Sequence, residues 1–247
     1  MAKSYHKLIL SYALCCFSAL FGIQAEADVI EFSVDELAAE TVLPVFEPSV
    51  SVRDRIVAKS GRFELGLGGG ISLNEPFYNP QNLVGNLTYH MTEVHGINLS
   101  YTHWLDGLSS YGTQLRAGQG FPAFDPSLAP SPESLIALNY QNTAYYGKIS
   151  LTKQTVMNLS IYGLAGLGAV GLSREGGYKI GAHAGVGQKV YFTPSLAFRF
   201  DLRFFAYRGP DPTTLDLDPA LPPPPPDSFG QDFFFNTLLN LGLVYIL

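Results

Sequence analysis

The C-terminal stretch constrains the fold more than any other part of this 247-residue chain. From Asp232 to Leu247 the sequence reads DFFFNTLLNLGLVYIL, and its hydrophobicity alternates with a period of two. One face is almost wholly apolar, whereas the other mixes amides, a glycine and aliphatic side chains. A period of two predicts a β-strand rather than a helix. A transmembrane β-strand needs about 9–11 tilted residues and carries aromatic residues near its ends, as this stretch does.

The alternative interpretation is an apolar edge strand of a soluble sandwich. An edge of that kind promotes aggregation in water, so lipid is the better environment for it. The pattern Asn240-x-Gly242-x-x-Tyr245-x-Leu247 also resembles the C-terminal insertion signal of bacterial outer-membrane barrels, although those more often end on Phe. The resemblance implies that barrel-assembly machinery recognises the C-terminal strand.

The N-terminus predicts export. Lys3 and Lys7 form a positive region, residues 8–23 are apolar, and Ala25-Glu26-Ala27 supplies a small-x-small cleavage site. We therefore interpret residues 1–27 as a signal peptide, with an N-terminal membrane helix as the alternative. Cleavage would remove both cysteines, so we expect neither a disulfide nor a cysteine metal site in the mature chain.

Composition excludes several classes of function. The formal net charge is −6 and the sequence contains no basic run, which argues against nucleic acid as a partner. No later apolar stretch reaches 18 residues, so we expect no second membrane helix. The histidines show no metal-ligand spacing, and we expect neither a metal nor a cofactor. Export combined with a lipid-facing strand predicts the outer membrane.

Seven earlier stretches also alternate with a period of two. They are 62–72, 82–91, 94–105, 143–152, 157–172, 178–192 and 195–207. Tight turns at every second connection, with mostly longer loops between them, are typical of bacterial barrels. The sequence therefore predicts an all-β fold, an eight-stranded antiparallel up-and-down transmembrane β-barrel with a periplasmic N-terminus and C-terminus. A further hairpin within 106–142 would give ten strands.

This interpretation divides the chain into a signal peptide (1–27), a periplasmic N-terminal tail (28–60) and an outer-membrane β-barrel domain (61–247). The start of the tail is acidic. We hypothesise that acidic residues of the tail dock under the periplasmic mouth of the barrel and offset positive charge in the lumen. The candidates are Glu31, Asp35, Glu36 and Glu40.

A charged side chain facing lipid costs about 2–4 kcal/mol near the bilayer midplane, so the charged faces should point into the barrel. This predicts a lumen-facing charged network of Glu64, Lys148, Lys179, His183, Lys189, Arg199, Asp201 and Arg203. Eight strands leave an interior that side chains can fill. The sequence favours a salt-bridged plug, with a narrow basic pore as the alternative.

Catalysis has little support in the sequence. Some eight-stranded barrels are lipid enzymes that use a His with Ser and an acid, but Ser100 and His103 lie three apart on one strand, hence on opposite faces. We therefore predict no catalytic residue and no enzyme. Specificity is expected in the outer loops, where the proline run 222–226 predicts a stiff polyproline II spike.

Four segments resemble a known family. Residues 61–65 (GRFEL), 72–78 (SLNEPFY), 87–90 (LTYH) and 146–148 (YGK) are similar to the outer-membrane β-barrel domain proteins of myxobacteria-like Gram-negative bacteria, over roughly 55–247. More distantly, the chain is similar to the small membrane barrel of OmpA-like proteins. The resemblance implies an outer-membrane protein without a catalytic motif. We expect a structural or surface-interaction role through the extracellular loops, with an unknown loop-binding protein as a possible partner. A small porin-like channel and a lipid-modifying enzyme are the alternatives.

Overall fold

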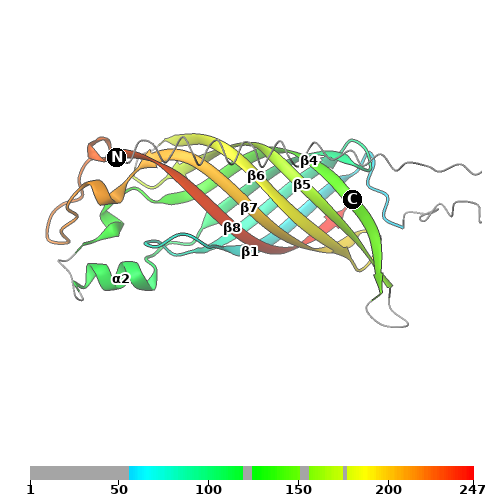
Figure 1. Ribbon diagram of the computed structural model, residues 1–247, viewed down its shortest axis with the longest axis horizontal. Helices are drawn as coiled ribbons and strands as arrows, with labels where there is room; N and C mark the ends of the chain where they lie inside the picture. Colours follow the sequence, from blue (N-terminus) through cyan, green and yellow to red (C-terminus); the bar gives the residue numbers. More distant parts are fainter. Residues whose placement is uncertain (1–55, 119–123, 151–155, 175–176) are drawn as a thin grey trace, which may run out of the picture. The chain divides into compact units, whose positions relative to one another are not determined.

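The computed structural model describes residues 56–118, 124–150, 156–174 and 177–247, and these contain eight strands. Each strand pairs antiparallel with the next, and the last pairs with the first, which closes the barrel (Figure 1). The predicted eight-stranded up-and-down barrel is confirmed. The strands are β1 (Phe63–Ser72), β2 (Gln81–His90), β3 (His95–Trp104), β4 (Pro132–Ser150), β5 (Val156–Leu172), β6 (Tyr178–Tyr191), β7 (Leu196–Pro210) and β8 (Gln231–Ile246).

The largest difference from the predicted strands is in β4. The sequence predicted a start at residue 143, whereas β4 begins at Pro132 and pairs with β3 along most of the added length. These added residues alternate too, with Leu135 and Ala137 buried and Ile136 and Leu138 exposed. The loop between β3 and β4 therefore contributes a longer strand rather than the extra hairpin of a ten-stranded barrel.

The barrel has two different ends. At the loop end lie the connections 73–80, 105–131, 173–177 and 211–230, and at the turn end lie the short turns together with both ends of the described chain. The loop end carries the helix α2 (Ser110–Arg116) and three short 3-10 helices, η2 (Pro126–Leu128), η3 (Pro212–Thr214) and η4 (Pro226–Ser228). None of the helices in the described part of the chain has the length and apolarity of a membrane span.

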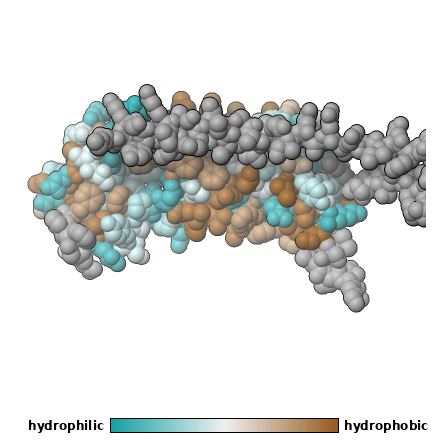
Figure 2. All heavy atoms as spheres, viewed as in Figure 1, coloured by the Kyte–Doolittle hydropathy of each residue, from teal (hydrophilic) through white to brown (hydrophobic). Residues whose placement is uncertain are grey.

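The outward face of the sheet is apolar. Aliphatic side chains form its middle band, and brown colouring marks this band on the visible face in Figure 2. The exposed aliphatic residues include Leu65, Leu67, Leu87, Leu99, Leu138, Ile161, Leu167, Val186, Leu241 and Leu243. Aromatic side chains flank the band: Phe63, Tyr89, Phe192 and Tyr245 at the turn end, and Tyr101, Tyr178, Phe233 and Phe235 at the loop end. An aliphatic band between two aromatic girdles is the surface of a transmembrane β-barrel.

The seam between β1 and β8 depends on glycine at its closest approach. Gly68 pairs with Gly242 across this seam. A Cβ on Gly68 would lie 2.8 Å from the Cα of Gly242, and one on Gly242 would lie 3.0 Å from the Cα of Gly68. These distances are too short for a methyl group on either strand, so glycine here allows the backbones to approach. β1 can therefore pair with the second half of β8, from Leu238 to Ile246.

Candidate functional site: the lumen and the cavity at the loop end

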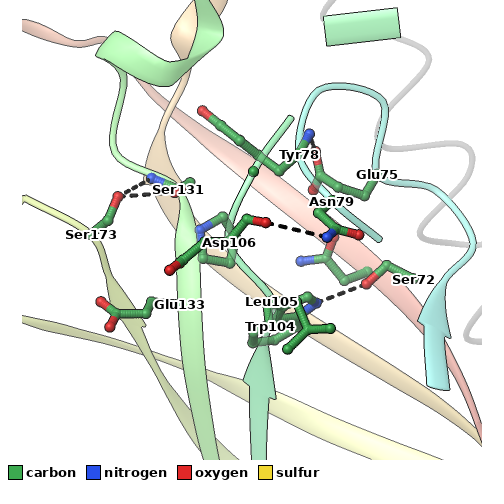
Figure 3. Close-up of a pocket in the computed structure, with 13 residues that line it drawn as sticks. Ser72, Glu75, Tyr78, Asn79, Trp104, Leu105, Asp106, Ser131, Glu133 and Ser173 are labelled. Atoms are coloured by element: carbon green, nitrogen blue, oxygen red, sulfur yellow. Dashed lines mark hydrogen bonds between the residues drawn. The ribbon is translucent and has the colours of Figure 1, made fainter. Parts of the chain in front are cut away.

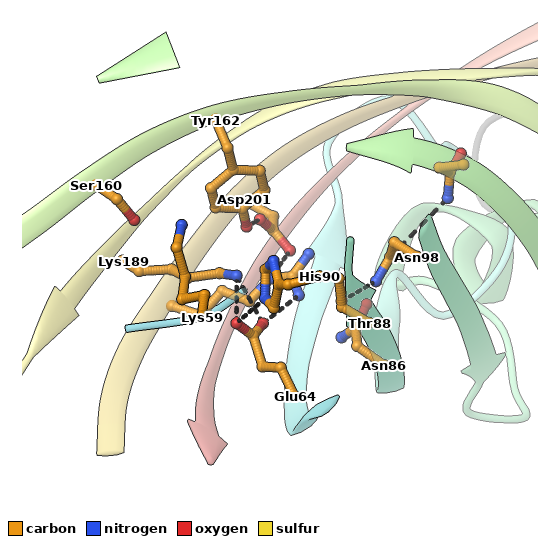
Figure 4. A network of polar contacts seen from close by, with 12 residues as sticks. Lys59, Glu64, Asn86, Thr88, His90, Asn98, Ser160, Tyr162, Lys189 and Asp201 are labelled. Carbon is orange, nitrogen blue, oxygen red and sulfur yellow. Dashed lines mark hydrogen bonds and ion pairs between the residues drawn. The ribbon is translucent and has the colours of Figure 1, made fainter. Parts of the chain in front are cut away.

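The charged side chains of the lumen form two linked centres, and Glu64 is the first (Figure 4). Its carboxylate accepts hydrogen bonds from Lys189 Nζ at 2.6 Å and 2.7 Å. His90 Nε2 lies 3.0 Å from the same carboxylate, and Arg199 Nη1 lies 3.8 Å from it. All four side chains are at most 3% exposed. Each charged side chain here is buried and lies beside one of opposite charge, as a buried ion needs.

Asp201 is the second centre. Its Oδ2 accepts hydrogen bonds from Arg199 Nε at 2.7 Å and from Arg203 Nη2 at 2.8 Å. Its Oδ1 accepts a hydrogen bond from the hydroxyl group of Tyr162. Arg203 Nη2 also donates to Asn86 Oδ1 at 2.7 Å. Because Arg199 contacts both carboxylates, the two centres form one network across the lumen.

Uncharged polar side chains continue the network towards the loop end. His183 Nδ1 lies 2.6 Å from Asn139 Oδ1, and Asn139 Nδ2 donates to Asn98 Oδ1 at 3.4 Å. Asn98 Nδ2 in turn donates to Thr88 Oγ1 at 2.9 Å. This chain crosses β2, β3, β4 and β6, so the polar filling reaches around much of the barrel wall.

An apolar cluster fills the lumen at the loop end. We call it the loop-end plug, and it consists of Trp104, Leu135, Val170, Leu172, Phe205, Tyr207 and Leu238. The rings of Phe205 and Tyr207 stack with centroids 5.4 Å apart. Trp104 donates its indole N–H to Ser72 Oγ at 2.9 Å, so the polar atom of the ring has a partner. The plug covers the polar network on the side of the long loops.

A second apolar cluster, the turn-end plug, lies at the other mouth. It consists of Val57, Tyr191, Ala197, Val244 and Ile246. Val57 comes from the segment before β1 and is fully buried.

Lys59 from this segment also enters the barrel, where its Nζ donates to Thr143 Oγ1 at 3.1 Å. The backbone N–H groups of Lys59 and Ser60 donate to Glu93 Oε1 at 3.0 Å and 2.9 Å. The chain before the first strand thus closes the turn end. The acidic residues hypothesised to dock there, Glu31, Asp35, Glu36 and Glu40, lie outside the described residues.

Six of the eight side chains predicted to face the lumen are buried inside the barrel: Glu64, His183, Lys189, Arg199, Asp201 and Arg203. Lys148 is not in the lumen but exposed, which corrects the prediction. It lies towards the end of β4, beyond the bulge between Thr143 and Tyr145, where the strand pairs only with β5 and not with β3. Lys179 is half-buried near the loop end, away from the two ionic centres.

Sequence reasoning missed Lys59, His90, Tyr162 and Asn86 as members of the network. His90 and Asn86 lie on the polar face of β2, and this alternation could have identified them. Tyr162 lies in β5, which is rich in glycine and alanine, so no clear alternation of polar and apolar residues marks its face. Lys59 precedes the first alternating residue, so no periodic signal marks it.

The predicted C-terminal insertion signal lies at the end of β8, with Leu247 directly after the strand. Asn240 and Gly242 face inwards, whereas Tyr245 and Leu247 are exposed on the outward face. Leu247 also donates its backbone N–H to Phe63 O at 2.9 Å, which ties the end of the chain to the start of β1. The apolar side chains of the signal therefore face the surroundings of the barrel.

A cavity of about 270 Å³ opens above the loop-end plug (Figure 3). Its wall contains three carboxyl groups, from Glu75, Asp106 and Glu133, and no basic residue. Burial raises the pKa of the Glu75 carboxyl above its usual value, although the backbone N–H groups of Phe77 and Tyr78 donate to it and oppose the rise. Burial also raises the pKa of the Tyr78 hydroxyl.

The loops around this cavity have a small apolar core of their own. Ala129, Leu217 and Phe229 are buried against one another. Asp125 donates its backbone N–H to Leu217 O at 2.8 Å, which joins the loop before β4 to the loop before β8. The loops are thus a folded cap rather than separate extensions.

The proline run is part of this cap. Pro225 has the φ of −63° and ψ of 144° of polyproline II, as predicted. Four prolines of the run, 223–226, line a groove together with Leu128, Pro130 and Arg174. None of the prolines of the run is buried, and the run lies beside the neighbouring loop across this groove.

The residues considered for metal binding or catalysis do not come together in the described ranges. No three His, Cys, Asp or Glu side chains there are grouped so that they could hold a metal ion. Ser100 is buried and donates to the backbone oxygen of Ala137, whereas His103 is half-buried and stacks on Tyr101.

No protein-family model and no curated protein matches the sequence. Among solved structures the chain is similar to the N-terminal β-barrel domain of Pseudomonas aeruginosa OprF, with 15% identity, a TM-score of 0.44 and coverage of 76% of this chain and 98% of that one. The outer membrane protein OprG of the same organism has 10% identity and a TM-score of 0.43, and the match covers 78% of this chain and 99% of that one. Ail, the attachment invasion locus protein of Yersinia pestis, has 13% identity and a TM-score of 0.36, and the match covers 76% of this chain and 99% of that one. The fold assignment rests on the strand pairing of the chain itself.

Proposed function

We propose that the protein is an integral outer-membrane β-barrel with a closed lumen, and that it acts as a structural or surface-interaction protein through its extracellular loops. The observation that carries this proposal is the filling of the lumen. A polar network crosses the interior, and apolar plugs cover it at both ends. An eight-stranded barrel has an interior that side chains can fill. In this proposal other molecules therefore contact the outer surface and the loops, not the lumen.

The loop end is the proposed interaction surface. It combines the folded cap with the cavity that Glu75, Asp106 and Glu133 line. Loops on a rigid scaffold are where binding residues concentrate. In this proposal the loop end is extracellular and both chain termini are periplasmic. The partners are outer-membrane lipid around the barrel, the barrel-assembly machinery at β8 and a protein at the loops. Membership of the myxobacterial barrel family, suggested by four short segments, is part of the proposal.

Single-channel conductance of the mature protein in planar bilayers tests the closed lumen. Folding is checked beforehand by the heat-dependent shift in gel migration, and a large porin serves as the positive control. We expect no discrete steps from the wild type. Anion-preferring steps that Arg203→Ala abolishes would contradict the proposal and favour the small channel with a basic lumen.

We also propose that the protein is not an enzyme. The support is that Ser100 and His103 do not meet, because one is inside the barrel wall and the other is not. Incubation of the refolded protein with vesicles of outer-membrane lipid tests this. Turnover of the lipid that Ser100→Ala abolishes would contradict the proposal.

A further inference from the structure

The part of β8 nearest the loop end has an open edge. β1 pairs with β8 as far as Leu238, and Leu73, just after β1, donates its backbone N–H to Thr237 O at 2.8 Å. β8 itself begins at Gln231, and within the described part of the chain its first residues pair with β7 alone. Residues 231–236 therefore have a neighbouring strand on one side only, and we call them the β8 edge.

The backbone groups of the β8 edge point alternately towards β7 and towards the open side. Gly230 O accepts a backbone N–H from the loop after β7, whereas Thr237 O accepts one from the residue after β1. Alternate residues of an antiparallel strand direct their N–H and C=O groups to the same side. Phe233 and Phe235 therefore direct theirs to the open side, as Thr237 does.

A side-chain amide already pairs with part of this edge. Asn74 Nδ2 donates to Phe235 O, and Asn74 Oδ1 accepts the N–H of Thr237 at 2.8 Å. The amide group thus pairs with β8 as the backbone of a neighbouring strand would. Beyond it, no group in the described part of the chain pairs with the N–H of Phe235 or with the carbonyl of Phe233. The next step of the ladder is open to another chain.

A groove of about 330 Å³ lies along the β8 edge. Residues 232–236 form part of its wall, and residues 74–78 of the loop after β1 form another part. The rings of Phe77 and Phe234 line it, together with prolines from three loops. An unpaired edge is a template for another strand, and a groove beside it accommodates the side chains of that strand.

The groove is acidic. Its carboxyl groups come from Glu75, Asp211 and Asp232, and none of the described residues in its wall is basic. Arg208 on β7 lies opposite Phe233, across β8 from the open side, and is not part of the wall. Carboxyl groups without a basic residue among them favour a guest that carries positive charge.

We propose, on the basis of the surface-interaction role proposed above, that the β8 edge binds an extended segment of a partner protein by strand addition, and that this segment alternates apolar with basic residues. Its backbone pairs with Phe235 N–H and Phe233 O. Side chains of an added strand alternate between the two faces of the sheet. The apolar ones lie beside Phe233 and Phe235 on the outward face, and the basic ones lie beside Asp232 and the groove.

A second copy of this chain fits the edge less well. It would bring its own Asp232 to the same place, and like charges on paired strands are unfavourable. The formal net charge of −6 adds to this repulsion.

Fluorescence anisotropy of a labelled peptide, acetyl-Lys-Val-Lys-Val-Lys-Val-amide, tests the proposal with the full-length mature protein in a non-ionic detergent. Phe235→Pro and Phe235→Ala are the matched variants. Both remove the ring, but only proline also removes the N–H on the open side, and neither removes a bond to β7. We expect Phe235→Pro to bind the peptide about tenfold more weakly than Phe235→Ala.

The charge of the guest is tested with the same assay. A peptide with glutamate in place of lysine should bind about tenfold more weakly than the lysine peptide. Asp232→Asn retains an acceptor for the N–H of Phe233 but loses the charge, and it should weaken binding of the lysine peptide about threefold. Asp218→Asn is the control, because Asp218 also accepts a backbone N–H but lies outside the groove wall, and it should bind as the wild type does.

Amide hydrogen exchange of the wild type, followed by NMR, provides a second measurement. Exchange at Phe235 should slow about tenfold at saturating lysine peptide, because strand addition gives its N–H a partner. Leu243 is the internal control, because it already pairs with Leu67 on β1, and its exchange should not change. If Phe235→Pro does not fold, this measurement decides the matter.

Equal affinity of Phe235→Pro and Phe235→Ala for the lysine peptide would overturn the proposal, and so would no binding by the wild type or unchanged exchange at Phe235. A wild-type dimer in sedimentation that Phe235→Pro abolishes would assign the edge to a second copy and overturn it as well. None of these results concerns the closed lumen. Conductance of the same preparation tests the proposed function separately, so the two failures are distinguishable.

Discussion

At the residue scale, buried charge distinguishes this barrel. Glu64 is only 1% exposed. Its carboxylate lies within hydrogen-bonding distance of Lys189 and His90 and forms an ion pair with Arg199. The sequence identified Glu64, Lys189 and Arg199 as lumenal, because lipid excludes charge from the other face of each strand. It could not say which charges meet. The contacts join β1 to β6 and β7, and their distances depend on how the barrel closes.

Glu64→Gln tests the importance of this pairing. The variant leaves Lys189 buried without its carboxylate partner, and breaking a buried ion pair in this way costs about 3–5 kcal/mol. We expect the free energy of unfolding in lipid vesicles, measured by urea titration, to fall by that amount.

Glu133→Gln is the control, because this carboxylate is exposed at the loop end, and we expect little change. The double variant Glu64→Gln, Lys189→Met should recover much of the loss, because it removes the orphaned charge. Equal effects of Glu64→Gln and Glu133→Gln would contradict a stabilising role for the network.

At the scale of elements, the segment before β1 closes the turn end. Val57 packs into the turn-end plug, and Lys59 enters the barrel to reach Thr143. The sequence assigned these residues to a tail, because no alternation of apolar and polar residues marks them. Their position depends on surfaces from β4, β6, β7 and β8 that are brought together only in the closed barrel. Secondary-structure patterns cannot reveal such a contact, whereas they located all eight strands.

Val57→Asp should release this segment. An aspartate at this fully buried position would place a charge in an apolar cluster, which is unfavourable. Lys59 is a trypsin site that is buried in the native protein, so its cleavage rate reports the release. We expect Val57→Asp to accelerate cleavage after Lys59 at least tenfold, roughly 1.4 kcal/mol.

Ala58→Asp is the control, because Ala58 is exposed next to Val57. Its cleavage rate should remain that of the wild type. Rapid cleavage of the wild-type protein itself would show that the segment does not hold the turn end closed.

At the scale of the whole molecule, the barrel turns its apolar side chains outwards and its charges inwards. This is the reverse of a soluble protein, and it follows from the solvent. In lipid, the wall needs no polar groups outside, and the closed sheet satisfies the backbone hydrogen bonds. The lumen has no access to lipid, so it can hold the polar side chains that a soluble protein would place on its surface.

Leu67→Arg tests whether lipid covers this wall. Leu67 is 78% exposed in the middle of β1. Arginine at the bilayer midplane costs about 2–4 kcal/mol, so the free energy of unfolding from lipid vesicles should fall by that amount.

Leu221→Arg is the matched control, because Leu221 is also exposed but lies in the cap at the loop end. We expect no measurable change for it. If the two variants behaved alike, the apolar band would not be embedded in lipid.

The sequence by itself determined the strands, their inward and outward faces and the even strand count. These follow from an alternation that each strand needs locally, because one side meets lipid and the other does not. Only the tertiary structure decided how the lumen is filled. The start of β4 at Pro132, the entry of Lys59, the exposure of Lys148 and the folded loop cap all depend on register, length and closure. These are contacts between residues far apart in the chain, and a periodic pattern carries no information about them.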